Sequence, residues 1–181
     1  MTKILIENIV ASTKICSKID VKQLSEKILD FKFTPDEFEG VTMKLDSPKT
    51  AILLFPDGKL VCTGAKSNQE LEDSIKKIVK KIKDAGFALM KNHEITIENV
   101  IASTDLKKEM HLSSINKGLL LQNVEYQPEK FPGLIYKIKE TCATLLLFSS
   151  GKLVCSGTKS LEDANSAIDL MKEKLSSIGA L

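Results

Sequence analysis

The chain has 181 residues, which is enough for one domain with a sizeable core or for two tightly joined halves. Hydrophobic residues make up 43% and charged residues 28% of it, which excludes a disordered chain. The net charge is +2 and all 26 basic residues are lysines, so charge alone does not predict nucleic-acid binding. No apolar stretch approaches the roughly 20 residues of a membrane span, and no signal peptide is evident, so we expect a soluble intracellular protein.

The chain repeats itself. Ile6–Thr13 returns as Ile97–Thr104 with six of eight residues identical, and Leu53–Ser67 returns as Leu146–Ser160 with eleven of fifteen identical. Because no Pro-, Gly- or Ser-rich linker separates the copies, we expect one pseudo-symmetric body built of a first repeat, residues 1–90, and a second repeat, residues 91–181.

Each copy predicts a strand, a short helix, further strands and a long closing helix. In the first copy we expect a short helix near 20–30 and strands near 4–12, 40–46, 50–56 and 59–65. In the second copy we expect a short helix near 109–117 and strands near 95–103, 119–126, 132–139, 143–149 and 152–158. Ser67 and Ser160, each followed three residues later by an acidic residue, mark the start of the long helices, and Gly86 and Gly179 mark their ends.

The strands are apolar on both faces. Alternation places Leu60 and Cys62 on one face and Val61 and Thr63 on the other. Two helices in each copy are enough to cover one face, so the other face is left as an apolar patch that implies a partner. The alternative is that two half-sheets stack face to face as a sandwich, and apolar residues on both faces are equally consistent with either arrangement.

Three segments resemble the TATA-box-binding protein family. They are Phe55–Ser67 (FPDGKLVCTGAKS), Tyr126–Lys137 (YQPEKFPGLIYK) and Glu7–Ala11 (ENIVA). The resemblance covers essentially the whole chain in both repeats, and the absence of a long N-terminal extension favours the archaeal form. It implies an α+β saddle: a curved, ten-stranded antiparallel sheet with four helices on the convex face and double-stranded promoter DNA on the concave face.

By this resemblance four phenylalanines wedge between base steps in the minor groove of the TATA box. They are Phe38 and Phe55 in the first repeat and Phe131 and Phe148 in the second. Apolar wedges of this kind unstack base steps and kink the duplex. An isolated phenylalanine is more often part of a core.

Other expected DNA contacts are also repeated. Asn8 and Asn99 lie between apolar neighbours, and the family uses both to donate to base edges at the centre of the site. Further base-edge contacts are expected from hydroxyl and aliphatic side chains: Thr63, Ser156, Val10, Ile101, Val61, Val154, Leu53 and Leu146. Phosphate contacts are expected from lysines: Lys44, Lys59, Lys66, Lys137, Lys152 and Lys159. In the first repeat Asp57 departs from the family pattern, so the two halves are expected to bind unequally.

The resemblance also names partners. Gln127 and Glu129 fall in the segment that contacts transcription factor B in the family, through which RNA polymerase is recruited. It places the protein in the cytoplasm, at the nucleoid of an archaeon, and no membrane partner, cofactor, metal or catalytic residue is expected. An exposed apolar face leaves self-association without DNA open.

Three other functions remain to be separated. Cys62 and Cys155 occupy equivalent positions, which would suit a pair of nucleophiles, but neither His93 nor His111 recurs in the other repeat. A carrier of lipids or small molecules would use an apolar concave sheet but would not need two symmetric asparagines and a set of lysines. A minor-groove module of a repair enzyme would normally carry an attached catalytic domain.

Overall fold

The computed structural model describes residues 3–119 and 123–181 of the chain. Its secondary structure confirms an α+β fold made of two repeats, four helices and one open antiparallel sheet of ten strands. The strand order is β2-β3-β4-β5-β1-β6-β10-β9-β8-β7. Because the strands belong to a single hydrogen-bonded sheet, the sandwich alternative is wrong.

The helices and strands follow the repeat. The first copy contains β1 (Leu5–Lys14), α1 (Val21–Lys27), β2 (Lys32–Phe33), β3 (Val41–Asp46), β4 (Lys49–Leu54), β5 (Lys59–Ala65) and α2 (Asn68–Asp84). The second contains β6 (Thr96–Asp105), α3 (Leu112–Leu119), β7 (Val124–Glu125), β8 (Gly133–Lys137), β9 (Thr144–Phe148), β10 (Lys152–Thr158) and α4 (Leu161–Ser177). The contacts divide the chain into an N-terminal unit, Asn8–Glu98, and a C-terminal unit, Asn99–Leu181 with Met1–Glu7.

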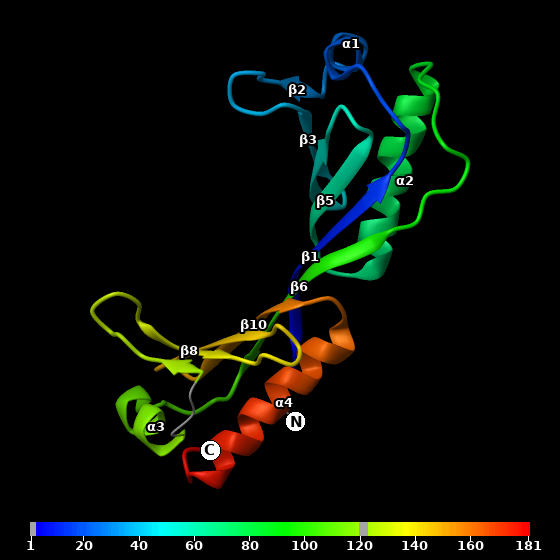
Figure 1. Ribbon diagram of the computed structural model, residues 1–181. Helices are drawn as coiled ribbons and strands as arrows, with labels where there is room; N and C mark the ends of the chain where they lie inside the picture. Colours follow the sequence, from blue (N-terminus) through cyan, green and yellow to red (C-terminus); the bar gives the residue numbers. More distant parts are fainter. Residues whose placement is uncertain (1–2, 120–122) are drawn as a thin grey trace. The chain divides into compact units, whose positions relative to one another are not determined.

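In the N-terminal unit, α2 packs against β5 and lies beside it in Figure 1. The strands point alternate residues toward this helix, so Ile52, Leu54 and Leu60 are fully buried. Their partners on α2, Ile75 and Ile78, are buried as well. Burial of these side chains is the main stabilising contribution to the unit.

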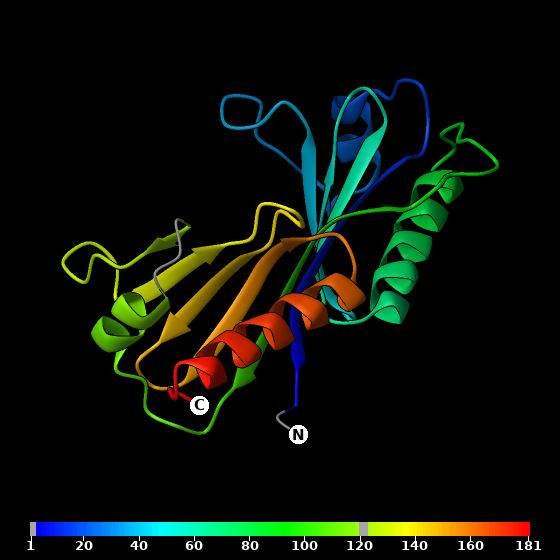
Figure 2. The ribbon, with the colours of Figure 1, turned by 60° about the horizontal axis from the view of Figure 1, so that its bottom comes forward.

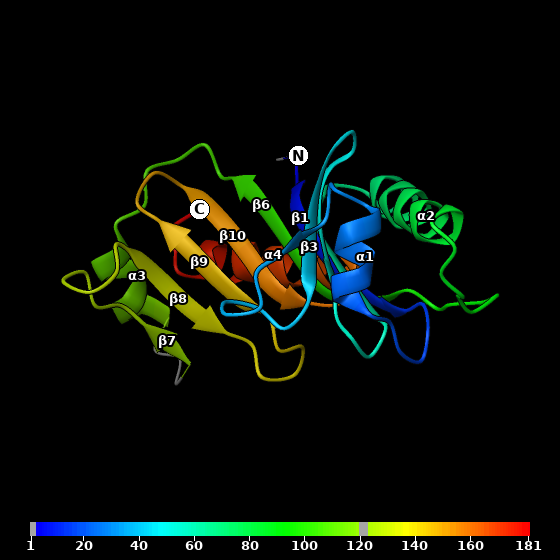
Figure 3. The same ribbon diagram turned by 90° about the horizontal axis from the view of Figure 1, so that it is seen from above.

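The C-terminal unit repeats this layering. Figure 2 shows α4 running across one face of the strands, and Figure 3 shows the same strands from the other side with α4 behind β10. Leu145 and Leu147 of β9 are fully buried, as are Ile168 and Leu175 of α4. Each unit therefore covers one face of its strands with helices.

Local signals set the ends of the long helices. The hydroxyl oxygens of Ser67 and Ser160 accept from the backbone N–H groups three residues later, at 3.1 and 3.0 Å. Gly86 and Gly179 follow the helices with φ of 89° and 69°, a left-handed conformation that favours glycine. The predicted starts and ends of both helices are confirmed.

The short elements differ from the sequence prediction. β2 was not expected, and two residues are too few to show alternation. The first short helix ends at Lys27 because Ile28 is extended, with φ −125° and ψ 94°. The second lies at Leu112–Leu119, so it begins three residues and ends two residues later than predicted. The strand expected near 119–126 appears as β7, and residues 120–122 lie outside the described residues.

Candidate nucleic-acid interface

On the face turned away from the helices, each unit has a row of residues that pair with one another across neighbouring strands. In the N-terminal unit the row is Ser12, Val61, Leu53 and Thr42. In the C-terminal unit it is Ser103, Val154, Leu146 and Ile135. Val10 and Ile101 also lie half-buried on their strands. Although these aliphatic side chains sit in central strands, they are only half-buried, because no helix packs on this side of the described residues.

A pair of phenylalanine rings stands beside each row. The Phe38 and Phe55 rings are edge-to-face at 5.0 Å between centroids, and those of Phe131 and Phe148 at 5.8 Å. All four rings are half-buried. The structure therefore brings the four predicted wedge residues together as two pairs, each on its own unit, with apolar ring surface left accessible.

A glycine beneath each ring pair makes room for it. A Cβ on Gly40 would lie 2.6 Å from Cε1 of Phe38, and one on Gly133 would lie 2.8 Å from Cε1 of Phe131. Since real carbon atoms do not approach so closely, any side chain here would displace the ring. The absence of a side chain at Gly40 and Gly133 therefore leaves the space that the rings occupy.

Asn8 is held by the strand next to it. Its Oδ1 accepts from the backbone N–H of Gly64 at 2.7 Å, and its Nδ2 donates to Thr63 Oγ1 at 3.1 Å. Gly64 has φ of 99°, and the β1–β5 register shifts between Ile9 and Ala11, so a bulge presents this N–H. An N–H donor fixes the amide oxygen, which leaves the amino group as the outward donor.

Asn99 repeats the arrangement with one difference. Its Oδ1 accepts from Gly157 N–H at 2.8 Å, again beside a register shift. Ser156, the counterpart of Thr63, makes no hydrogen bond to it. The Asn99 amino group has no hydrogen-bond acceptor among the described residues, so both of its hydrogens are free for a ligand.

The six predicted phosphate lysines are all exposed. Lys137 forms an ion pair with Glu125 at 3.1 Å, an exposed contact that contributes little stability and that a phosphate would replace at small cost. The other five have no ion-pair partner among the described residues, so their charge is available to an anion.

Two repeat-related hydrogen bonds between a serine and a glutamate were not predicted from the sequence. Ser12 Oγ donates to Glu98 Oε1 at 2.6 Å, and Ser103 Oγ donates to Glu7 Oε1 at 2.5 Å. These contacts bury the serine ends of both rows. The signal that would have found them is the repeat, because both Glu and Ser recur at the same offset.

The loop after β7 holds the predicted partner-binding residues. Gln127 and Glu129 are exposed, and the Gln127 carbonyl accepts from the backbone N–H groups of Lys130 and Phe131 at 2.9 and 3.0 Å. This turn fixes the backbone that carries the Phe131 ring, while the side chains of Gln127 and Glu129 remain at the surface.

The repeated thiols are unsuited to nucleophilic chemistry. Cys62 and Cys155 are fully buried on the helix side, and burial raises the pKa of each thiol to about 11. A reactive thiol has a lowered pKa and access to solvent. Within residues 3–119 and 123–181, no three His, Cys, Asp or Glu side chains are grouped to hold a metal ion. None of the helices in that part of the chain is both long and apolar enough to span a membrane.

The fold and this face define a class: two-repeat α+β proteins whose units each cover one sheet face with helices and leave an apolar, asparagine-bearing face open. The family model described as transcription factor TFIID, or TATA-binding protein, matches residues 3–85 and 94–178. The chain belongs to the TATA-binding protein family, a family of transcription factors.

Individual relatives agree along the whole chain. The chain is 41% identical to the TATA-box-binding protein of Archaeoglobus fulgidus over 179 residues, 99% of this chain and 98% of the relative. It is 42% identical to that of Pyrococcus furiosus, covering 99% and 93%. The solved structure of Methanococcus jannaschii TBP superposes with a TM-score of 0.88 at 41% identity, covering 97% of this chain and 99% of the other.

Proposed function

We propose that this protein is a general transcription initiation factor that binds the minor groove of TATA-box promoter DNA with the open faces of both units. The observation that carries the proposal is the uncovered face, where half-buried aliphatic rows, two oriented asparagines and exposed lysines lie in equivalent places. A monomer does not normally leave so much apolar strand surface without a partner.

The polar groups of the face fit the minor groove. A·T and T·A pairs present only acceptors there, adenine N3 and thymine O2, whereas G·C adds the guanine amino group. The Asn8 and Asn99 amino groups are donors whose orientation is fixed by Gly64 and Gly157. Donors facing acceptors tolerate either A·T orientation, and the guanine amino group would meet a donor and the aliphatic row.

The phenylalanine pairs supply the wedge. We infer that Phe38 with Phe55, and Phe131 with Phe148, insert between base steps and kink the duplex, since apolar side chains that enter the minor groove act in this way. Support comes from their half-buried rings, which occupy space that a side chain at Gly40 or Gly133 would fill. Unstacking costs a few kcal/mol per step, and contact of the bent DNA with the apolar rows offsets it.

Lysines then contact the backbone. Lys44, Lys59, Lys66, Lys137, Lys152 and Lys159 are proposed to meet phosphates, which makes the affinity fall as salt rises. Lysine is a single-point donor, so these contacts add attraction without a bidentate grip.

The loop before Phe131 is proposed to bind transcription factor B, which recruits RNA polymerase. Gln127 and Glu129 are exposed there, and the turn that carries them also carries a wedge residue. A partner on this loop would therefore favour the DNA-bound position of the Phe131 ring. Binding of transcription factor B to the protein–DNA complex, measured for Gln127→Ala with Glu129→Ala, is expected to weaken while DNA binding is retained.

The test of the main proposal is a gel shift with a short TATA duplex, a G·C-substituted duplex of equal length, and Phe148→Ala beside the wild type. The proposal predicts selective binding of the TATA duplex by the wild type and a loss of that binding in Phe148→Ala. Equal binding to both duplexes, or no binding to either, would contradict the proposal. The apolar face would then be better explained as the binding surface of a carrier of small apolar ligands.

A further inference from the structure

A hollow of about 350 Å³ lies in the C-terminal unit between α3 and the segment that follows α4. Figures 1 and 2 show α3 beside the C-terminal end of α4. The walls of the hollow are apolar: Ile115 of α3 is buried, and Ile178 and Ala180 are half-buried. Gly118 also lines the hollow and has no side chain to fill it.

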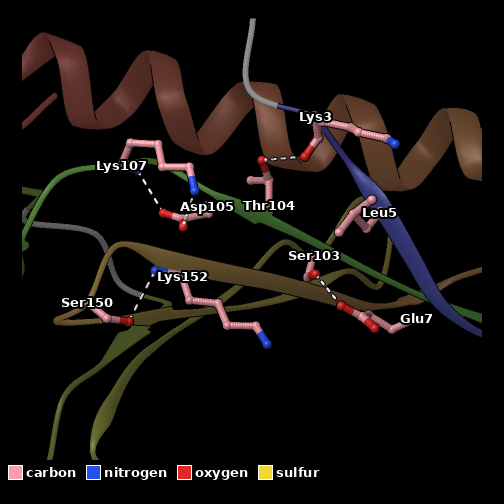
Figure 4. Close-up of a pocket in the computed structure, with 9 residues that line it drawn as sticks. All are labelled: Lys3, Leu5, Glu7, Ser103, Thr104, Asp105, Lys107, Ser150 and Lys152. Atoms are coloured by element: carbon pink, nitrogen blue, oxygen red, sulfur yellow. Dashed lines mark hydrogen bonds and ion pairs between the residues drawn. The ribbon is translucent and has the colours of Figure 1, made fainter.

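This hollow is separate from the surface proposed to bind DNA. Figure 4 shows a larger hollow, of about 740 Å³, which is lined by Ser103 and Lys152 of the open face and therefore belongs to that surface. None of the residues proposed to contact DNA is among those that line the hollow between α3 and α4. That hollow therefore has no part in the proposed DNA contacts.

The repeat aligns the hollow with a position of the N-terminal unit. The hydrogen bond from Leu24 N–H to the carbonyl four residues earlier recurs from Ile115 N–H. The hydrogen bond from Phe87 N–H to the carbonyl five residues earlier recurs from Ala180 N–H. The residues that correspond across the two units are therefore Lys27 with Gly118, and Phe87 with Ala180.

In the N-terminal unit a phenylalanine occupies the equivalent place. The Phe87 ring is half-buried, and the Lys27 ammonium lies over it, 5.0 Å from the ring centroid, in a cation–π contact. The C-terminal unit lacks both side chains, because Gly118 and Ala180 stand at these positions. Ile178 packs on Gly118, with its Cδ1 3.2 Å from where a Cβ would lie, and the hollow remains beside it.

The rim of the hollow is polar. Lys108 and Glu109 line it from the segment before α3, together with the imidazole of His111 and the hydroxyl of Ser114. Lys108 and Glu109 are exposed and have no ion-pair partner in the part of the chain that the structure describes. An apolar hollow with one charge of each sign at its rim suits an aromatic side chain with charged neighbours, because the ring loses water while the charges stay at the surface.

We propose that the hollow between α3 and α4 is a docking site for another protein, which inserts one aromatic side chain where the N-terminal unit has Phe87. The partner segment carries this aromatic residue between one acidic and one basic residue, which pair with Lys108 and Glu109. Aromatic side chains that fill a pocket carry much of the binding energy at protein interfaces. The site goes beyond DNA binding, and its test needs no DNA, so the result is independent of the proposed function.

Tripeptides test the site directly. Protein labelled at its isoleucine methyl groups is titrated with acetyl-Asp-Phe-Lys-amide and with acetyl-Lys-Phe-Asp-amide, and the NMR signals of Ile115 and Ile178 are followed. The better of the two orders is expected to bind with a Kd on the order of 1 mM and to shift both signals. The same peptide with alanine in place of phenylalanine is expected to bind at least about tenfold more weakly. Serine at both flanks should weaken binding about threefold.

Variants that copy the N-terminal unit fill the hollow. Ala180→Phe is expected to raise the Kd of the tripeptide at least about tenfold, because its own ring takes the place of the peptide ring. Gly118→Lys places a side chain where the first repeat has Lys27, suits a helix better than glycine, and should also weaken peptide binding. Ala88→Phe adds the same ring at an exposed position and should leave peptide binding unchanged.

The outcomes are distinct. Saturable shifts of Ile115 and Ile178 that are lost without the peptide ring and in Ala180→Phe would support the site. No saturable shift, equal binding of the peptide without the ring, or undiminished binding in both Ala180→Phe and Gly118→Lys would overturn it. A serine-flanked peptide that binds as tightly as the charged peptides would overturn the pairing with Lys108 and Glu109.

Discussion

Neighbouring leucines of β9 separate the two faces in one experiment. Leu147 points toward α4 and is completely buried, whereas Leu146 is half-buried on the open face. Leu147→Ala leaves a cavity in a packed core, which costs about 2–5 kcal/mol in the free energy of unfolding. Leu146→Ala removes a side chain that is already half-exposed, so its cost is about 1 kcal/mol or less.

The effects on DNA binding are expected in the opposite order. DNA that covers the exposed half of the Leu146 side chain buries apolar surface worth about 1 kcal/mol of binding free energy. Leu146→Ala is therefore expected to raise Kd about fivefold. Leu147→Ala leaves Kd nearly unchanged where the variant is still folded. Urea unfolding followed by circular dichroism gives the stability, and fluorescence anisotropy with a labelled TATA duplex gives Kd. The reasoning is refuted if Leu146→Ala binds like the wild type, or if both variants lose the same stability.

Three further changes test the site and the core. Asn99→Asp keeps an oxygen that accepts from Gly157 N–H, but it removes the amino donor and adds a negative charge. A gel shift should therefore show at least about tenfold weaker TATA binding, with the stability of the protein unchanged. Binding equal to that of the wild type would exclude Asn99 from the base-edge contacts. Gly133→Ala places a Cβ 2.8 Å from the Phe131 ring and should weaken TATA binding in anisotropy measurements. Gly86→Ala, whose Cβ meets nothing within 4 Å, strains a backbone with φ of 89° and lowers stability, but it should leave DNA binding of the folded protein unchanged; an unaffected Gly133→Ala would mean that the ring position is not important. Burial raises the thiol pKa of Cys62 and Cys155 from 9.0 to about 11, so between these pH values the folded state keeps protons that the unfolded state loses. Urea titrations should therefore show the free energy of unfolding falling as pH rises from about 9 to 11. The fall should be smaller in the double variant Cys62→Ala, Cys155→Ala, and an equal fall would contradict the role of the two thiols.

Much of the sheet could be predicted from residues alone. The alternation in Ala51–Phe55 and Lys59–Thr63 predicts both the strands and their two faces, and the structure has Leu54 and Leu60 buried with Leu53 and Val61 half-buried. Period-two alternation is a local property of a strand, which is why it is visible in the sequence. Alternation did not decide whether the apolar outer face was open or stacked.

Contacts between residues far apart in the chain could not be predicted from the sequence. Nothing near Asn8 in the chain shows that Gly64 supplies the N–H that orients its amide, because the two residues are brought together by a bulge between β1 and β5. The same holds for the packing of Gly133 under the Phe131 ring. The assignment of these phenylalanines as wedges came from the family resemblance, since an isolated phenylalanine is more often part of a core.

The N-terminal residues show the same limit. The repeat suggests that Lys3 belongs with the first copy, yet its carbonyl is bound by Thr104 and it lines a hollow of the C-terminal unit. The association of Lys3 with the C-terminal unit can be seen only when the pairing of the strands is known.

Inosine substitution tests most directly whether the open faces read the minor groove. An inosine·cytosine pair presents the major-groove edge of G·C but lacks the guanine amino group, so its minor groove resembles that of A·T. Anisotropy titrations would compare a TATA duplex, the same duplex with every A·T replaced by inosine·cytosine, and one with every A·T replaced by G·C. We expect the inosine duplex to bind nearly as tightly as the TATA duplex, and the G·C duplex to bind much more weakly. Binding of the inosine duplex as weak as that of the G·C duplex would show that the protein reads the major groove, and would contradict recognition through the minor groove.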